Sequence, residues 1–195
     1  MHTDKVEVWL VRHGETPRSL TGRLAGRVDT PLTPVGRAQA RALGHLLTGH
    51  TFNSVWSSNL RRAVTTARLA FGEPRRDPRL RELDFGDLEG LPWRRLPEPH
   101  QTALERFSGL NPPGGEPVDA LRRRVAGFLD ELPAGRHLAF THGGVIRAVR
   151  QMVGEDGFVP TGTVVVVDWT RRRPLFVHTP DAERSNAGNH HPDKA

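Results

Sequence analysis

The sequence contains no cysteine, which excludes disulfide bonds, thiolate catalysis and zinc sites built on sulfur. It also has no apolar run near the roughly 20 residues that a helix needs to cross a bilayer. Residues 1–5 are polar and lead directly into an apolar stretch, which leaves no room for the hydrophobic segment of a signal peptide. These absences predict a soluble, cytoplasmic protein with no membrane partner.

Lysine is scarce although the chain is basic. The 28 basic residues outnumber 22 acidic ones and give a formal net charge of +6, yet only Lys5 and Lys194 are lysines, which leaves 26 arginines. Guanidinium groups bind phosphate through paired N–H donors, so one interpretation of the arginines is an anionic substrate. The other is a general arginine bias on ordinary solvated surfaces, and we favour this second interpretation for most of the arginines. The arginine runs at 122–124 and 171–173 lack interleaved aromatic residues, so nucleic acid is not expected as a partner.

Apolar residues recur with the periods of strands and helices along most of the chain. Strands are expected at 6–11, 54–57, 138–141, 163–169 and 174–179, and helices at 34–47 after a Thr33 cap, 60–71 after a Ser58 or Asn59 cap, 101–107, 118–132 and 143–153. Strands that alternate with helices predict an α/β fold, a three-layer α/β/α sandwich with a mostly parallel central sheet.

The length favours one domain, because 195 residues suffice for one full core. We expect that domain to span residues 1–180. The polar tail 181–195 is expected to be disordered, and its His190 and His191 are too few to hold a metal.

Four separated segments place complementary chemical groups at strand ends or turns. Arg12 and His13 follow the first strand, Arg62 lies at a helix start, Glu82 precedes a glycine turn, and His142 follows a later strand. In open α/β sheets, ligands bind beyond the carboxyl ends of the strands. A neutral imidazole attacks phosphorus, guanidiniums and helix-start amides hold phosphoryl oxygens, and a carboxyl group moves the leaving-group proton. Together the segments predict a phosphate site.

Each of these residues also has a structural interpretation. A lone histidine after a strand is most often a loop or core residue, and a surface ion pair contributes only about 0 to 1 kcal/mol. Arg61 competes with Arg62, and Glu89, which could pair with an arginine, competes with Glu82. The combination of all four segments favours the phosphate site.

The same segments resemble the motifs of the histidine phosphatase superfamily, which includes cofactor-dependent phosphoglycerate mutases and many small phosphatases. The motifs follow the family's order over nearly the whole chain before the tail. They are Arg12-His13-Gly14-Glu15-Thr16, Asp29-Thr30-Pro31-Leu32-Thr33 with Gly36 and Gln39-Ala40, Ser57-Ser58-Asn59-Leu60 with Arg62-Ala63 and Thr66-Ala67, Leu80-Arg81-Glu82-Leu83-Asp84-Phe85-Gly86 with Glu89-Gly90, Pro113-Gly114-Gly115-Glu116, and Thr141-His142-Gly143-Gly144.

The resemblance implies roles for individual residues. The implied catalytic set is His13 as the phosphorylated residue, Glu82 as proton donor, and Arg12, Arg62 and His142 as the rest of the phosphate pocket. Substrate contacts are expected from Thr16, Ser19, Gly26 and Gly143, and neither a metal nor another cofactor is implied. Many relatives carry an asparagine in place of Ser19, and the shorter serine hydroxyl would reach the phosphoryl group through a water.

Within this resemblance, the compact segment 91–117 favours a phosphatase. Mutases protect phosphohistidine under longer insertions, whereas a more open site lets water hydrolyse it. We therefore expect a phosphomonoester hydrolase that acts through phosphohistidine on a small phosphorylated metabolite. A phosphoglycerate mutase and a noncatalytic phospholigand-binding protein are the alternatives, and a homodimer is left open. Specificity is expected to reside in 91–117 and 17–26, which do not name the substrate.

Overall fold

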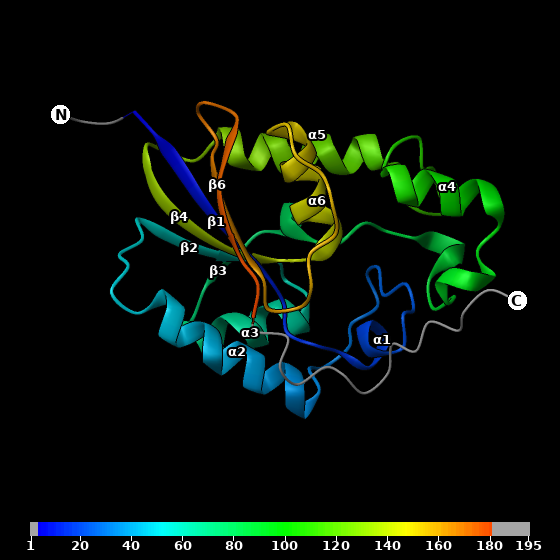
Figure 1. Ribbon diagram of the computed structural model, residues 1–195, viewed down its shortest axis with the longest axis horizontal. Coiled ribbons are helices and arrows are strands. Elements are labelled where there is room, and N and C mark those ends of the chain that lie inside the picture. Colours follow the sequence, from blue (N-terminus) through cyan, green and yellow to red (C-terminus); the bar gives the residue numbers. More distant parts are fainter. Residues whose placement is uncertain (1–3, 181–195) are drawn as a thin grey trace, which may run out of the picture.

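A six-stranded sheet lies at the centre of the computed structural model, which describes residues 4–180 (Figure 1). Its strands are β1 (Val6–Arg12), β2 (Ser54–Ser57), β3 (Arg75–Arg76), β4 (Gly135–Thr141), β5 (Val164–Asp168) and β6 (Arg173–His178). They lie in the order β3-β2-β4-β1-β5-β6. The first four strands in this order are parallel, and β5 runs antiparallel to both β1 and β6.

Helices cover both faces of the sheet (Figure 1). One face carries α2 (Pro34–Leu47) and α3 (Arg61–Ala70), and the other carries α5 (Val118–Asp130) and α6 (Gly143–Met152). The connections hold α1 (Pro17–Leu20), α4 (Glu98–Arg106) and 3₁₀ turns at Pro78–Leu80, Gly86–Leu88 and Trp93–Arg95. This arrangement confirms the predicted layered α/β fold with a mostly parallel sheet.

Strand β1 supplies the core on both of its faces. Val8 and Leu10 pack with the cluster that includes α5 and α6, whereas Trp9 and Val11 pack with the cluster under α2 and α3. Successive side chains of a strand point to opposite faces, so a continuous apolar run suits a strand covered on both sides. All four side chains are at most 3% exposed.

Several local expectations are corrected by the structure. Thr33 does cap α2, since its hydroxyl accepts from the N–H of Gly36 at 3.0 Å. The predicted Ser58 or Asn59 cap of α3 is wrong, because the N-cap residue is Leu60, whose side chain cannot accept a hydrogen bond. Strand β3 and helix α1 form inside segments expected to be connectors, and α4 begins at Glu98 instead of residue 101.

The register of the central strands sets the position of the site. Arg12 pairs with Thr141, so His13 and His142, which follow them, lie side by side beyond the same edge of the sheet. The N–H of His13 donates to the carbonyl of Thr141 at 3.0 Å, and the N–H of Arg12 donates to that of Thr163 at 2.9 Å.

Three further expectations concern a membrane-spanning helix, the C-terminal tail and the number of domains. Within residues 4–180, no helix has both the length and the apolar character needed to cross a membrane. The expected tail 181–195 lies outside the described residues, and the single-domain span 1–180 stays a prediction.

Candidate active site

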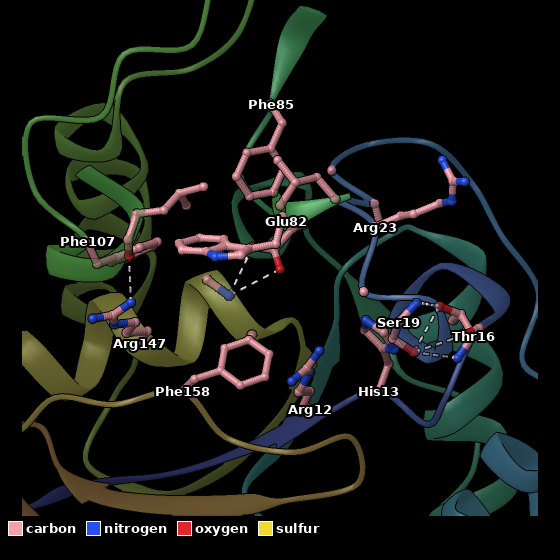
Figure 2. Close-up of a pocket in the computed structure, with 18 of the residues that line it drawn as sticks. Arg12, His13, Thr16, Ser19, Arg23, Glu82, Phe85, Phe107, Arg147 and Phe158 are labelled. Atoms are coloured by element: carbon pink, nitrogen blue, oxygen red, sulfur yellow. Dashed lines mark hydrogen bonds between the residues drawn. The ribbon is translucent and has the colours of Figure 1, made fainter. Parts of the chain in front are cut away.

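A cavity of about 420 Å³ opens beyond the carboxyl ends of β1 and β4 (Figure 2). Of the nine residues expected from the sequence, eight line it: Arg12, His13, Thr16, Ser19, Gly26, Arg62, Glu82 and Gly143. His142 is fully buried and does not line it.

One ring nitrogen of His13 is unprotonated and carries an electron pair. Its Nδ1 lies 2.7 Å from the carbonyl of Gly14, and because a carbonyl only accepts, Nδ1 carries the proton. Nε2 then has a free electron pair, and it accepts from the Nε–H of Arg62 at 3.2 Å. Burial, helped by the guanidiniums of Arg62 and Arg12, holds the pKa of His13 well below its ordinary value of 6.5. The ring is therefore neutral at physiological pH, as a nucleophile requires.

Arg62 is fully buried and hydrogen-bonds to three separate segments of the chain. Its Nε lies 3.2 Å from both His13 Nε2 and His142 Nδ1, its Nη1 donates to the carbonyl of Val28 at 2.8 Å, and its Nη2 donates to that of Gly26 at 2.6 Å. A guanidinium has five N–H donors, so one donor on each terminal nitrogen stays available for an anion. The competitor Arg61 is exposed and does not line the cavity.

His142 contacts the guanidinium from behind the cavity wall. Its Nδ1 accepts from Arg62 Nε–H, so in the neutral ring Nε2 carries the proton and donates to the hydroxyl of Ser58 at 2.8 Å. Burial holds the pKa of His142 well below 6.5, with further lowering by Arg62. In this arrangement both ring nitrogens are occupied, so the expected contact of His142 with a phosphoryl oxygen stays a prediction.

Arg12 supplies a second buried cation. Its Nη1 donates to the carbonyl of Val159, its Nε finds no acceptor among the described residues, and its guanidinium carbon lies 4.3 Å from the ring centre of Phe158. Burial lowers the pKa of Arg12 to about 10, which leaves it charged at neutral pH. A charged group with an unpartnered donor at a cavity wall is suited to bind an anion.

Glu82 is held by the first turn of α6. The N–H of Gly144 lies 3.1 Å from each carboxylate oxygen, and the N–H of Leu83 donates to Oε1 at 2.9 Å. A Cβ at residue 144 would lie 2.4 Å from Glu82 Oε1, so a larger residue there would shift the carboxylate from this position. The competitor Glu89 instead accepts from the backbone N–H of Arg27 at 2.6 Å and lies outside the cavity lining.

Thr16 and Ser19 form a capping box at the start of α1. The hydroxyl of Ser19 accepts from the N–H of Thr16 at 2.8 Å and donates to the carbonyl of Thr16 at 3.0 Å. Both residues line the cavity, and Figure 2 shows them beside His13. The Ser19 hydroxyl is thus engaged in local structure, and its water-mediated contact with substrate stays a prediction.

Sequence reasoning missed Ser58 as a partner of His142 and the aromatic part of the cavity. Phe85, Trp93, Phe107 and Phe158 all line it. Phe158 lies in the connection before β5, and this connection reaches the catalytic edge only because β5 runs antiparallel to β1. Strand direction is not readable from a short apolar run, so no sequence signal placed Phe158 there.

No group of three or more histidine, aspartate or glutamate side chains in the described part of the chain is arranged to hold a metal ion. What residues 4–180 bring together is an unprotonated imidazole nitrogen, two guanidiniums and a carboxylate. This set can bind a phosphoryl group, attack it and move a proton.

Comparisons with known proteins agree with this chemistry. The model of the histidine phosphatase superfamily (branch 1) matches residues 8–179. Fructose-2,6-bisphosphatase TIGAR B of Danio rerio is 38% identical over 132 residues, which cover 63% of this chain and 51% of that protein. The probable phosphoglycerate mutase GpmB of Yersinia enterocolitica is 37% identical over 150 residues, 71% of this chain and 70% of that protein.

Solved structures with the same fold include two that bear on function. The phosphoglycerate mutase of Thermus thermophilus superposes with a TM-score of 0.85 at 50% identity, covering 90% of this chain and 99% of that chain. A putative alpha-ribazole-5'-P phosphatase from Escherichia coli superposes with a TM-score of 0.74 at 29% identity, covering 91% of this chain and 96% of that chain.

Proposed function

Because the chain belongs to branch 1 of the histidine phosphatase superfamily, we propose that it hydrolyses small phosphomonoesters through a phosphohistidine formed on Nε2 of His13. The observation that carries this proposal is the state of His13, a buried neutral ring with its Nε2 electron pair at a cavity that Arg12 and Arg62 also line. The chain is an enzyme of the phosphatase and mutase type, and hydrolysis is the activity that we assign within that type.

In the first half-reaction, Nε2 of His13 attacks phosphorus as the bond between phosphorus and the ester oxygen breaks. The protonated carboxyl of Glu82 gives its proton to the departing alkoxide, which leaves as an alcohol. Arg12 and the free N–H groups of Arg62 hold the phosphoryl oxygens. Because the Nε–H of Arg62 donates to the Nε2 electron pair, a phosphoryl oxygen must take over that donor before attack.

In the second half-reaction, water attacks the phosphorus of phosphohistidine and gives a proton to the Glu82 carboxylate. The bond between phosphorus and Nε2 breaks, inorganic phosphate leaves, and His13 returns to its neutral form. One carboxyl group therefore serves as acid and then as base. The compact segment 91–117 and the open cavity favour water as the acceptor.

The test measures hydrolysis of p-nitrophenyl phosphate by the wild type, His13→Ala and His45→Ala. His45 is exposed on α2, outside the cavity, so its substitution is the matched control. We expect His13→Ala to lower kcat by about a thousandfold or more, while His45→Ala stays near the wild type. Undiminished hydrolysis by His13→Ala would refute the nucleophile.

Two other activities give different results in the same preparation. A mutase would interconvert 3- and 2-phosphoglycerate under stimulation by 2,3-bisphosphoglycerate with little release of phosphate, which an enolase-coupled assay detects. A noncatalytic binder would show tight phosphate binding in calorimetry without turnover of any ester. The solved structure of a phosphoglycerate mutase at 50% identity makes the first comparison the more important one.

A further inference from the structure

The cavity has two chemically different ends. Arg12, His13 and Arg62 form the phosphate end. In Figure 2, Phe85 and Phe107 lie beyond Glu82 from Arg12 and His13, and Phe158 lies beside Arg12, between the two ends. The apolar end is lined by Leu24, Phe85, Trp93, Leu104, Phe107 and Phe158. A substrate whose phosphoryl group reaches His13 must place the rest of the molecule against these side chains.

Phe158 is the most exposed of the apolar side chains at this end. It is 66% exposed even though one face of its ring covers the guanidinium of Arg12. A large apolar side chain left open beside a binding cavity gains free energy when an apolar ligand removes it from water. In Figure 2 its ring and that of Phe107 lie on the same side of the cavity, away from His13.

Phe107, the second aromatic residue at this end, has an uncommon backbone conformation. It ends α4 with φ 48°, in the left-handed region that favours glycine, yet its side chain is only 3% exposed. Such conformations occur where the surrounding structure enforces them, often at ligand sites. Here the residue that ends α4 in this conformation carries an aromatic ring that lines the cavity.

Among the described residues, the cations that line the cavity outside its phosphate end are Arg147 and Arg23, and Arg147 is paired with an acid. Arg147 donates through Nε to Asp156 at 2.7 Å, and its terminal nitrogens donate to the carbonyls of Leu104 at 2.8 Å and Glu105 at 2.5 Å. Arg23 is exposed at the rim, donates to the carbonyl of Gly90 at 2.8 Å, and points away from His13 in Figure 2. A carboxylate or second phosphate packed against Phe107 would lose water beside the guanidinium of Arg147, which Asp156 already neutralises.

We propose that the cavity selects phosphomonoesters of uncharged alcohols that carry a flat apolar group, such as an aromatic ring, which packs against Phe158 and Phe107. Phe158 is then a substrate-binding residue and determines specificity. The proposal rests on the proposed phosphatase function and narrows its substrate class. It disfavours substrates with a second anionic group, such as phosphoglycerates and sugar bisphosphates.

The experiment compares kcat/KM for 2-phenylethyl phosphate, ethyl phosphate and 3-phosphoglycerate. The first two are primary alkyl esters with leaving groups of similar basicity, so they differ mainly in the apolar group. For the wild type we expect kcat/KM to be about 10- to 100-fold higher for the phenylethyl ester than for the ethyl ester, and lowest for 3-phosphoglycerate. Phe158→Ala should lower kcat/KM much more for the phenylethyl ester than for the ethyl ester, and so remove most of this preference.

Phe176→Ala is the matched control, because Phe176 is 42% exposed on β6 and does not line the cavity. Equal kcat/KM for the two alkyl esters, or a preference for 3-phosphoglycerate, would overturn the proposal. An equal loss for both alkyl esters in Phe158→Ala would also overturn it, since the residue would then act only by positioning Arg12.

Binding separates this proposal from the proposed function. If no ester is hydrolysed, the phosphatase function fails, while calorimetry with the nonhydrolysable 2-phenylethylphosphonate and ethylphosphonate still tests the apolar end in the wild type. Tighter binding of the phenylethyl compound by about tenfold or more would support the apolar end, and equal affinities would refute it.

Discussion

Arg62 connects two histidines through a single N–H group. Its Nε lies 3.2 Å from Nε2 of His13 and from Nδ1 of His142, so each ring must offer an electron pair to the same donor. A protonated ring in either place would set a positive charge against a buried guanidinium. The arrangement therefore keeps both rings neutral and the nucleophilic nitrogen unprotonated.

The role of Glu82 depends on how much help the leaving group needs. Glu82→Gln keeps an acceptor for the N–H of Gly144 but cannot give up a proton. We expect kcat to fall by about 10²- to 10⁴-fold for an alkyl phosphate, because a strongly basic alkoxide must be protonated as it leaves. The loss in formation of phosphohistidine should be much smaller for p-nitrophenyl phosphate. Burst-phase kinetics on both substrates measure the difference.

Glu89→Gln is the control for this prediction, since Glu89 lies near the site but accepts from the backbone N–H of Arg27. It should leave the rates on both substrates close to those of the wild type. If Glu82→Gln slowed both esters equally in the first step, Glu82 would bind or orient substrate without donating the proton.

At the scale of elements, the segment that follows β1 contacts the start of α2 at two glycines. A Cβ at Gly14 would lie 2.2 Å from the carbonyl oxygen of Gly36, and one at Gly36 would lie 2.1 Å from that of Glu15. Backbone atoms cannot move away as a flexible side chain can. This contact fixes the chain directly after His13 against the helix.

We predict that Gly36→Ala destabilises the fold by about 1–3 kcal/mol, because the new methyl group overlaps a backbone carbonyl. It should also lower kcat, since the displaced residue, Glu15, is only two residues after His13. The matched control is Gly127→Ala in α5, where a Cβ would have no neighbour within 4 Å. That change should stabilise the protein by roughly 0.5–1 kcal/mol and leave kcat unchanged. Urea unfolding and steady-state kinetics would contradict this account if both variants behaved alike.

Strong local patterns were sufficient to predict most elements. The Thr33 cap and the following Pro34 marked the start of α2, and the buried run of β1 marked the central strand. The start of α3 was misplaced because Ser58 is a good capping residue by type, whereas its hydroxyl here serves His142 and the N–H of Leu60. The two-residue β3 carries no period that could reveal it.

The candidate site also has a part that could be predicted from the sequence and a part that could not. Arg12, His13 and His142 could be proposed from their types and their places after strands. The choice of Arg62 and Glu82 over Arg61 and Glu89 leaned on the resemblance to the histidine phosphatase motifs. The aromatic end could not be proposed, because a phenylalanine in a loop has no chemistry that distinguishes it from the core. Its role emerges only when the antiparallel β5 brings Phe158 next to Arg12.

At the scale of the whole molecule, two neutral buried histidines make stability depend on pH. The pKa of His13 and of His142 lies well below 6.5 in the folded protein, whereas both titrate near 6.5 in the unfolded chain. Below that pH the unfolded chain binds more protons, so acid favours unfolding. Each histidine therefore lowers the free energy of unfolding by up to about 1.4 kcal/mol per pH unit as the pH falls below 6.5.

We predict that the free energy of unfolding falls less steeply between about pH 6.5 and 5 in His13→Asn than in the wild type. The difference in slope should approach about 1.4 kcal/mol per pH unit. Urea unfolding at a series of pH values measures it. Above about pH 7 the two curves should run parallel, and parallel curves through the acidic range would show that His13 is not held neutral by the fold.

The pairing of β1 also governs how the protein forms during synthesis. This strand leaves the ribosome well before its neighbours in the sheet, β4 and β5, with Val6 opposite Gly135 and Val11 opposite Val164. At a synthesis rate of roughly 5–20 residues per second, both apolar faces of β1 stay without their partner strands for on the order of ten seconds. Such distant pairing slows folding and leaves the waiting strand open to chaperones or aggregation. The same delay keeps the nascent chain catalytically silent, because His142 is made only after β4.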